Sequence, residues 1–189
     1  MYQQAIEQYL KQHGHDRINL KAVLFDMDGV LFNSMPNHAR SWHKVMERMG
    51  FGLSEQEAYM HEGRTGADTI NIISRRERGY DATDEEIKAI YAAKSEEFNK
   101  CPEAPRMPGA WEVLNKIKDD GLTRMIVTGS GQVSLLDRLN KNFPGIFQKE
   151  LMVTAFDIKF GKPNPDPYLM ALEKGGLKPN EAIVIENAP

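Results

Sequence analysis

Four short apolar segments alternate along the chain with stretches of helical periodicity. In the first segment, Val23, Leu24 and Phe25 form a continuous apolar run, which is typical of a strand covered on both faces in a parallel sheet. Further strands are expected at residues 123–128, 150–154 and 182–185, and helices at 110–119, 132–139 and 167–173. Strands and helices in alternation predict an α/β fold with a doubly wound, Rossmann-like parallel sheet.

The chain between the first strand and the second has a different pattern, with apolar residues at helical spacing and no convincing strand. Thr83 with Glu86 has the spacing of a helix-capping box. Three prolines between residues 101 and 110 predict a stiff linker where this segment ends. We therefore expect two domains, a discontinuous α/β core of residues 1–35 and 106–189 and an inserted all-helical domain of residues 36–105.

Composition and charge narrow the class of protein. The chain carries 24 Lys and Arg against 27 Asp and Glu, a formal net charge of −3, which is too little positive charge for a general electrostatic grip on nucleic acid. No apolar stretch approaches the roughly 20 residues that cross a bilayer, so no membrane insertion is expected. The single cysteine, Cys101, cannot form an intrachain disulfide. Because no signal-peptide pattern is found either, a reducing, cytoplasmic location is expected.

Two acidic residues come directly after the first strand. Asp26 and Asp28 stand beside Gly29, at the carboxyl end of a strand, where open parallel sheets bind their ligands. Two such acids can take different roles, one as a nucleophile and one as a proton donor and acceptor. A strand-ending aspartate followed by an ordinary Asp-Gly turn would give the same pattern, so these residues alone leave both interpretations open.

Polar residues also follow the other three strands. Thr128 and the amide of Gly129 offer a small anion cradle. Lys162, held between a glycine and a proline, suits a fixed positive charge opposite phosphate or carboxylate, although loop lysines are more often solvated. Glu186 and Asn187 supply the hard oxygen ligands that Mg²⁺ prefers.

The order of these elements resembles the haloacid dehalogenase superfamily of phosphotransferases. The four motifs of that family match Asp26-Met27-Asp28-Gly29, Thr128, Lys162 and Glu186-Asn187. The helical insertion resembles the C1 cap of the branch that includes β-phosphoglucomutase and small-molecule phosphatases. The resemblance spans nearly the whole chain and implies Mg²⁺-dependent phosphoryl transfer.

The resemblance also implies roles for the four motifs. Asp26 would be the nucleophile that becomes an aspartyl phosphate, and it would also bind Mg²⁺. Asp28 would be the general acid and base, with its backbone carbonyl on the metal, and its presence favours phosphoryl transfer over dehalogenation. The remaining roles fall to Thr128 and Gly129 as phosphate-binding groups, Lys162 as the neutralising cation, and Asn187 with Glu186 as further metal ligands. Many relatives carry an aspartate at the position of Asn187, so weaker metal binding is our hypothesis.

Four residues in or near the insertion are implied to bind the substrate: Ser34, His38, Arg64 and Lys94. The arginine that binds the second phosphate in the mutase falls at Gly66 here, and Arg64 lies two positions earlier. This displacement favours a phosphatase that acts on a small phosphorylated sugar or similar metabolite. A β-phosphoglucomutase that works through a bisphosphate remains the alternative, and a non-catalytic, phosphate-responsive binding module is the second.

Several residues receive no chemical role from the sequence. The four histidines outside the motifs show no paired spacing for a transition metal, and the two tryptophans resemble core or interface residues; these residues are His13, His15, His43, His61, Trp42 and Trp111. The chain stops at Pro189, inside the fourth motif, whereas relatives continue through a helix and at least one more strand. We therefore expect a longer natural protein.

Overall fold

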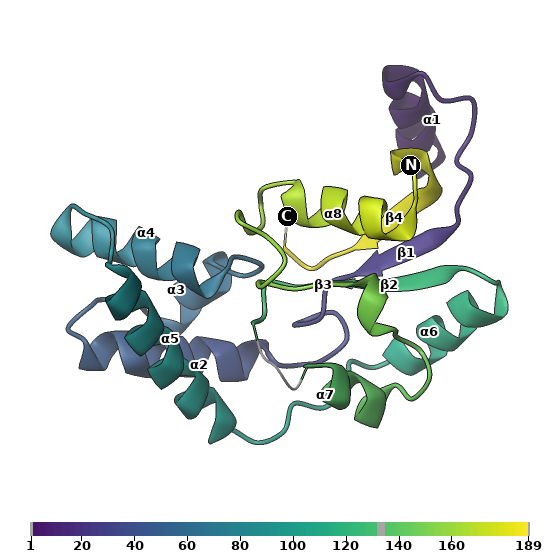
Figure 1. Cartoon of the computed structure of the whole chain (residues 1–189). Helices are drawn as coiled ribbons and strands as arrows, with labels where there is room; N and C mark the ends of the chain where they lie inside the picture. The colour runs from purple at the N-terminus through teal and green to yellow at the C-terminus, as the bar shows by residue number, and fades with distance from the viewer. Residues whose placement is uncertain (1, 132–134, 189) are drawn as a thin grey trace.

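A four-stranded parallel sheet forms the centre of the molecule (Figure 1). The computed structural model describes residues 2–131 and 135–188. The strands are β1 (Ala22–Phe25), β2 (Thr123–Val127), β3 (Met152–Val153) and β4 (Ala182–Ile185), in the spatial order β3-β2-β1-β4. The predicted α/β fold with a parallel sheet is confirmed.

Helices cover both faces of the sheet because successive side chains of its inner strands point to opposite sides. Val23 and Phe25 of β1 pack into one apolar cluster, and Leu24 packs into the other. All four residues of β1 are buried, as the continuous apolar run predicted. The first cluster is covered by α6 (Ala110–Asp119) and α7 (Leu135–Asn142), and the second by α8 (Asp166–Gly175) (Figure 1).

The third strand is shorter than the sequence predicted. Residues 149–151 form a turn of 3₁₀ helix, and only Met152 and Val153 pair with β2. The strand ends because the side chain of Asp157 accepts hydrogen bonds from both the amide and the hydroxyl of Thr154, each at 2.8 Å. The helix predicted over residues 132–139 is described only from Leu135 onward, since residues 132–134 lie outside the described part of the chain.

The insertion is helical, as predicted, and has its own apolar interior. The buried members of its cluster all come from residues 39–90, whereas the clusters on the sheet contain no residue between 36 and 103. The exact domain boundaries remain a prediction, and this separate packing supports them. The four helices are α2 (Met35–Arg48), α3 (Glu55–Met60), α4 (Gly66–Arg78) and α5 (Asp84–Asn99), and the capping box of Thr83 and Glu86 opens the last of them.

The two connections between the insertion and the sheet run side by side. The amide of Met107 donates to the carbonyl of Leu31 at 2.8 Å, and the amide of Asn33 donates to the carbonyl of Pro105 at 2.9 Å. Away from this junction, α1 (Tyr2–His13) extends beyond the sheet (Figure 1). Within the described ranges, none of the helices is both long and apolar enough to cross a membrane.

Candidate active site

The register of the sheet brings the predicted site residues to one edge. Phe25, the last residue of β1, pairs with Ile126 on one side and Ile185 on the other. The residues that follow these strands therefore emerge together at the carboxyl edge. The amide of Asp26 donates to the carbonyl of Ile185 at 3.0 Å, and the amide of Thr128 donates to that of Val153 at 2.9 Å.

Asp26 and Lys162 form a buried ion pair at this edge. The Lys162 Nζ lies 2.7 Å from Asp26 Oδ1 and 3.2 Å from Glu186 Oε2, and both partners of the first pair are almost fully buried. Burial raises the pKa of Asp26 to about 7, although Lys162 opposes this shift. For Lys162, burial lowers the pKa, but the carboxylates of Asp26 and Glu186 outweigh it and hold the ammonium charged.

Asp28 faces the same pocket and is held by two residues of the predicted substrate set. Ser34 Oγ donates to Asp28 Oδ1 at 2.5 Å, and His38 Nε2 lies 3.2 Å from the same oxygen. Burial on its own would raise the pKa of Asp28, but the contacts with His38 and Ser34 lower it below its usual range. Asp28 is therefore a carboxylate, ready to accept a proton.

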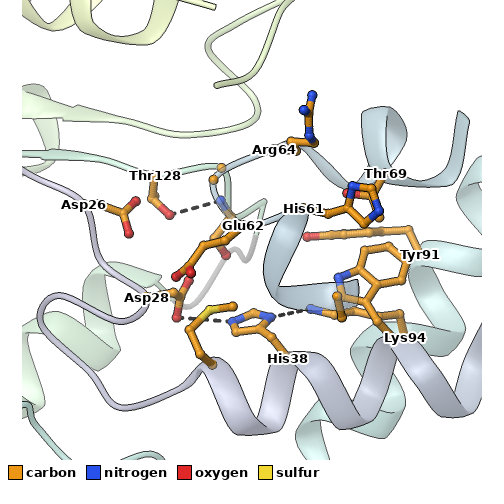
Figure 2. A pocket seen from close by; sticks show the side chains of 17 residues that line it. Asp26, Asp28, His38, His61, Glu62, Arg64, Thr69, Tyr91, Lys94 and Thr128 are labelled. Atoms are coloured by element: carbon orange, nitrogen blue, oxygen red, sulfur yellow. Dashed lines mark hydrogen bonds and ion pairs between the residues drawn. The ribbon is translucent and has the colours of Figure 1, made fainter. Parts of the chain in front are cut away.

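His38 connects Asp28 to Lys94 (Figure 2). Lys94 Nζ lies 2.8 Å from His38 Nδ1, and its ammonium also lies over the rings of Trp42 and Phe98. Because an ammonium can only donate, Nδ1 accepts and the ring proton is on Nε2, toward Asp28. Burial, with help from Lys94, lowers the pKa of His38 and keeps the ring neutral, and burial also lowers the pKa of Lys94 to about 8.

The predicted phosphate cradle lies directly under the insertion. Thr128 is buried and its hydroxyl accepts a hydrogen bond from the amide of Ser130 at 3.1 Å. Gly129 contacts the backbone of the loop between α3 and α4, residues 61–65, which we term the cap loop. A Cβ atom on Gly129 would lie 2.8 Å from the carbonyl oxygens of Gly63 and Arg64. Only a glycine allows the cap loop to approach the cradle this closely.

The cap loop also reaches the fourth motif through Glu62, which the sequence analysis missed. Asn187 Nδ2 donates to Glu62 Oε1 at 2.6 Å. Burial raises the pKa of Glu62 and the fields of Asp26 and Asp28 add to this shift, while the hydrogen bond from Asn187 opposes it. The contact joins residues 125 positions apart, so no local pattern in the sequence could have indicated it.

Arg64 is the predicted substrate residue whose placement differs most from expectation. It belongs to the wall of the pocket, but Figure 2 shows its guanidinium directed away from Asp26 and Asp28. The other members of the predicted substrate set lie together: Ser34 and His38 both contact Asp28, and Lys94 contacts His38.

The pocket has a second wall that the sequence did not reveal. Besides the predicted residues, its lining includes Trp42, His61, Glu62, Thr69 and Tyr91, all from the insertion (Figure 2). Trp42 is buried in the core of the insertion, as expected, and it also lines the pocket, as does His61. Trp42 and Tyr91 stand at helical spacing, which predicted burial and gave no signal of the pocket.

The donors at the edge of the sheet fit a divalent cation. The carboxylate of Asp26, the backbone carbonyl of Asp28 and the amide oxygen of Asn187 are hard oxygen donors of the kind Mg²⁺ prefers. Three carboxylates, those of Asp26, Glu62 and Glu186, lie near the ammonium of Lys162, so this part of the site has an excess of negative charge. Three or more His, Cys, Asp or Glu side chains do not gather into a metal cage in the described residues. The predicted set does not require one, because it includes a backbone carbonyl and an amide.

Known proteins similar to this chain include several phosphatases. Hexitol phosphatase A of Escherichia coli is 32% identical over 171 residues, which cover 89% of this chain and 75% of that protein. The phosphorylated carbohydrates phosphatase of Thermotoga maritima is 26% identical over 170 residues, covering 89% of this chain and 77% of that protein.

A solved structure from Bacteroides vulgatus, provisionally described as a β-phosphoglucomutase, is 77% identical and superposes with a TM-score of 0.95. The match covers 98% of this chain and 75% of that one. The family model of haloacid dehalogenase-like hydrolases matches residues 20–189, which include all four motifs. The chain therefore belongs to the haloacid dehalogenase-like hydrolase family and is an enzyme of that family.

Proposed function

We propose that the protein hydrolyses the phosphate ester of a small sugar or sugar alcohol, with Mg²⁺, through an aspartyl phosphate on Asp26. The observation that carries this proposal is the buried pair of Asp26 and Lys162, 2.7 Å apart, with Thr128 lining the same pocket as Asp26. A carboxylate nucleophile, a fixed cation and a hydroxyl at one strand edge are the groups that an in-line phosphoryl transfer requires.

The proposed reaction has two steps. In the first, Asp28, which is ionised in the free site, takes up a proton from solvent as the substrate binds. An oxygen of Asp26 then attacks phosphorus, the bond from phosphorus to the sugar oxygen breaks, and that oxygen takes the proton from Asp28. In the second, water attacks phosphorus, gives a proton to the Asp28 carboxylate, and the Asp26–phosphorus bond breaks to release phosphate. Ser34 and His38 would hold Asp28 in position for both transfers.

Mg²⁺ at Asp26, Asp28 and Asn187 would supply positive charge that offsets the carboxylates and the phosphoryl oxygens. A nearby divalent cation also favours the ionised form of Asp26, whose pKa is about 7 without one. Glu186 contacts Lys162 at 3.2 Å, so we assign it to orienting this lysine rather than to direct metal ligation. Cys101 is a free thiol, which fits the expected reducing, cytoplasmic setting.

Hydrolysis is favoured over the mutase reaction by the direction of Arg64. A mutase must bind the second phosphate of a bisphosphate, and the guanidinium of Arg64 points away from the pocket (Figure 2). The two phosphatases that resemble the chain support the same choice. The Bacteroides vulgatus structure keeps the mutase as the second candidate, whereas membership in a family of hydrolases disfavours a purely binding function.

The test is phosphate release from sugar and sugar-alcohol phosphates, with and without Mg²⁺, by the wild type and by Asp26→Asn. We expect turnover that needs Mg²⁺ and falls roughly 10⁴-fold or more in Asp26→Asn, because the nucleophile is lost. Circular dichroism checks that the variant folds. Full turnover by Asp26→Asn would contradict the assignment of the nucleophile. Bisphosphate-dependent isomerisation of β-glucose 1-phosphate with little phosphate release would favour the mutase.

A further inference from the structure

The insertion side of the pocket carries an imidazole without a hydrogen-bond partner in the described part of the chain. His61 follows α3 and lines the pocket with Thr69 and Tyr91, and its side chain is only 12% exposed. Neither ring nitrogen has a hydrogen-bond partner among the described residues, and both are shielded from solvent. The nearest carboxylate oxygen, on Glu57, is 3.7 Å from Nε2, which is beyond hydrogen-bond reach.

Buried polar groups are normally hydrogen-bonded, and one left unpaired destabilises the fold. Glu57 cannot easily move to pair with His61, because its carboxylate already contacts Arg76. The imidazole faces the pocket instead, together with Thr69 and Tyr91, across from Asp26 and Asp28 (Figure 2). A small turn of the ring toward the pocket would bring a nitrogen within reach of a bound molecule, which is therefore the natural partner of His61.

The chemistry of this wall indicates what kind of molecule it binds. Burial lowers the pKa of His61, and Arg64 and Arg76 disfavour its cation, while Glu57 opposes these effects. The neutral ring has one donor and one acceptor nitrogen, which is the pattern of a hydroxyl group. The hydroxyl of Thr69 donates to the carbonyl of Thr65 at 3.2 Å and keeps its oxygen free to accept.

The same wall is poorly suited to a second phosphate. The guanidinium of Arg64 is directed away from the pocket (Figure 2). Lys94 is already engaged by His38 and by the rings of Trp42 and Phe98. Among the described residues of the lining, no other lysine or arginine is present. An uncharged, hydroxylated group fits this end of the pocket better than an anion.

We propose that His61 is a specificity-determining residue that hydrogen-bonds a hydroxyl of the substrate's uncharged, polyhydroxylated part. The proposal rests on the proposed function for the phosphate end, where Asp26 and Thr128 bind the phosphoryl group. It assigns the enzyme to monophosphates of sugars or sugar alcohols, in preference to bisphosphates and to phosphate esters of apolar alcohols. Trp42 and Tyr91 complete this wall with aromatic surface for the carbon skeleton.

The test compares two substrates of different hydroxyl content, sorbitol 6-phosphate and p-nitrophenyl phosphate, with Mg²⁺ present. In His61→Leu we expect kcat/KM for sorbitol 6-phosphate to fall about 10-fold, mainly through a higher KM, because a buried hydrogen bond is lost. The value for p-nitrophenyl phosphate should change less than about 2-fold. His61→Gln, which keeps a donor and an acceptor, should recover most of the loss.

Met60→Leu is the matched control, because Met60 is the neighbouring residue and is 77% exposed. Its kcat/KM for both substrates should equal that of the wild type. An equal loss for both substrates in His61→Leu, or no loss for either, would overturn the proposal. If the wild type hydrolyses neither substrate, the proposed function fails, and calorimetry still decides the role of His61. In that case, tighter binding of sorbitol 6-phosphate than of hexyl phosphate, abolished by His61→Leu, supports the proposal, and equal binding overturns it.

Discussion

Two lysines of the site are buried, Lys162 near the sheet and Lys94 in the insertion, and their surroundings give them opposite properties. Lys162 contacts the carboxylates of Asp26 and Glu186, which raise its pKa despite burial. Lys94 has an imidazole and two aromatic rings as its nearest partners, and burial lowers its pKa to about 8. Lys162 therefore keeps its positive charge, whereas Lys94 loses its positive charge as the pH rises above about 8.

The lowered pKa of Lys94 predicts a stability change with pH. The pKa is 10.5 when unperturbed and about 8 in the fold, so keeping the ammonium charged opposes folding. This cost is fully present below pH 8, decreases between pH 8 and 10.5, and disappears above that range. The wild type should therefore gain stability relative to Lys94→Met as pH rises through this window, measured by urea unfolding at each pH.

The control for this experiment is Lys88→Met, since Lys88 is on the exposed side of the same helix, α5. The difference in unfolding free energy between Lys88→Met and the wild type should stay constant from pH 8 to 10.5. A constant difference for Lys94→Met as well would show that the charge of Lys94 carries no cost in the fold.

At the scale of elements, the cap loop and the loop after β4 are joined by one hydrogen bond. Asn187 Nδ2 donates to Glu62 Oε1, and the amide oxygen of Asn187 stays available for a metal. An aspartate at position 187 could not donate this hydrogen bond. The side-chain amide of Asn187 can therefore offer its oxygen to a metal while its nitrogen donates a hydrogen bond to the insertion.

Asn187→Asp should loosen the cap loop in metal-free protein, because two carboxylates would then face each other. We expect amide hydrogen exchange at residues 61–65 to become roughly 5- to 10-fold faster, while Mg²⁺ binds more tightly through the added negative charge. The double variant Asn187→Asp with Glu62→Gln should restore slow exchange, since the donor and acceptor have then changed places. Unchanged exchange in Asn187→Asp would refute the role of this contact.

The elements themselves could be predicted because their signals are local. The run from Val23 to Phe25 is apolar at every position since both faces of β1 are covered, and Thr83 with Glu86 forms the capping box that its spacing indicated. Strand β3 was predicted too long, since residues 150 and 151 lie in a 3₁₀ turn and the Asp157 side chain binds the amide of Thr154, and hydropathy shows neither.

The site was predictable only in part, for a related reason. Asp26, Thr128 and Lys162 follow strands or lie in loops, where polar residues stand out from their surroundings. Glu62 and His61 meet the site only because the cap loop packs over it. Such contacts depend on how the two domains are arranged, and the spacing of residues in the sequence does not indicate that arrangement.

At the scale of the whole molecule, the insertion contacts the sheet edge through glycines. Gly63 of the cap loop packs against the side chain of Lys162, and Gly129 packs against the carbonyls of residues 63 and 64. The two connections between the domains, residues 31–33 and 105–107, are hydrogen-bonded to each other. The insertion is therefore joined to the core by two connections that are hydrogen-bonded to each other, and it packs against the core through the cap loop.

Gly129→Ala should separate the insertion from the phosphate cradle while leaving each domain folded. The added Cβ would lie 2.8 Å from the carbonyl oxygens of Gly63 and Arg64, a distance that requires the backbone to move. We expect a loss of about 10²-fold in kcat/KM, because a displacement near 1 Å misaligns reacting groups. Hydrogen exchange in the cap loop should be faster, and the melting temperature should change little. Gly131→Ala is the matched control, since its added Cβ would meet its nearest neighbour at an ordinary 3.5 Å; equal activity in the two variants would show that close approach at Gly129 is not required.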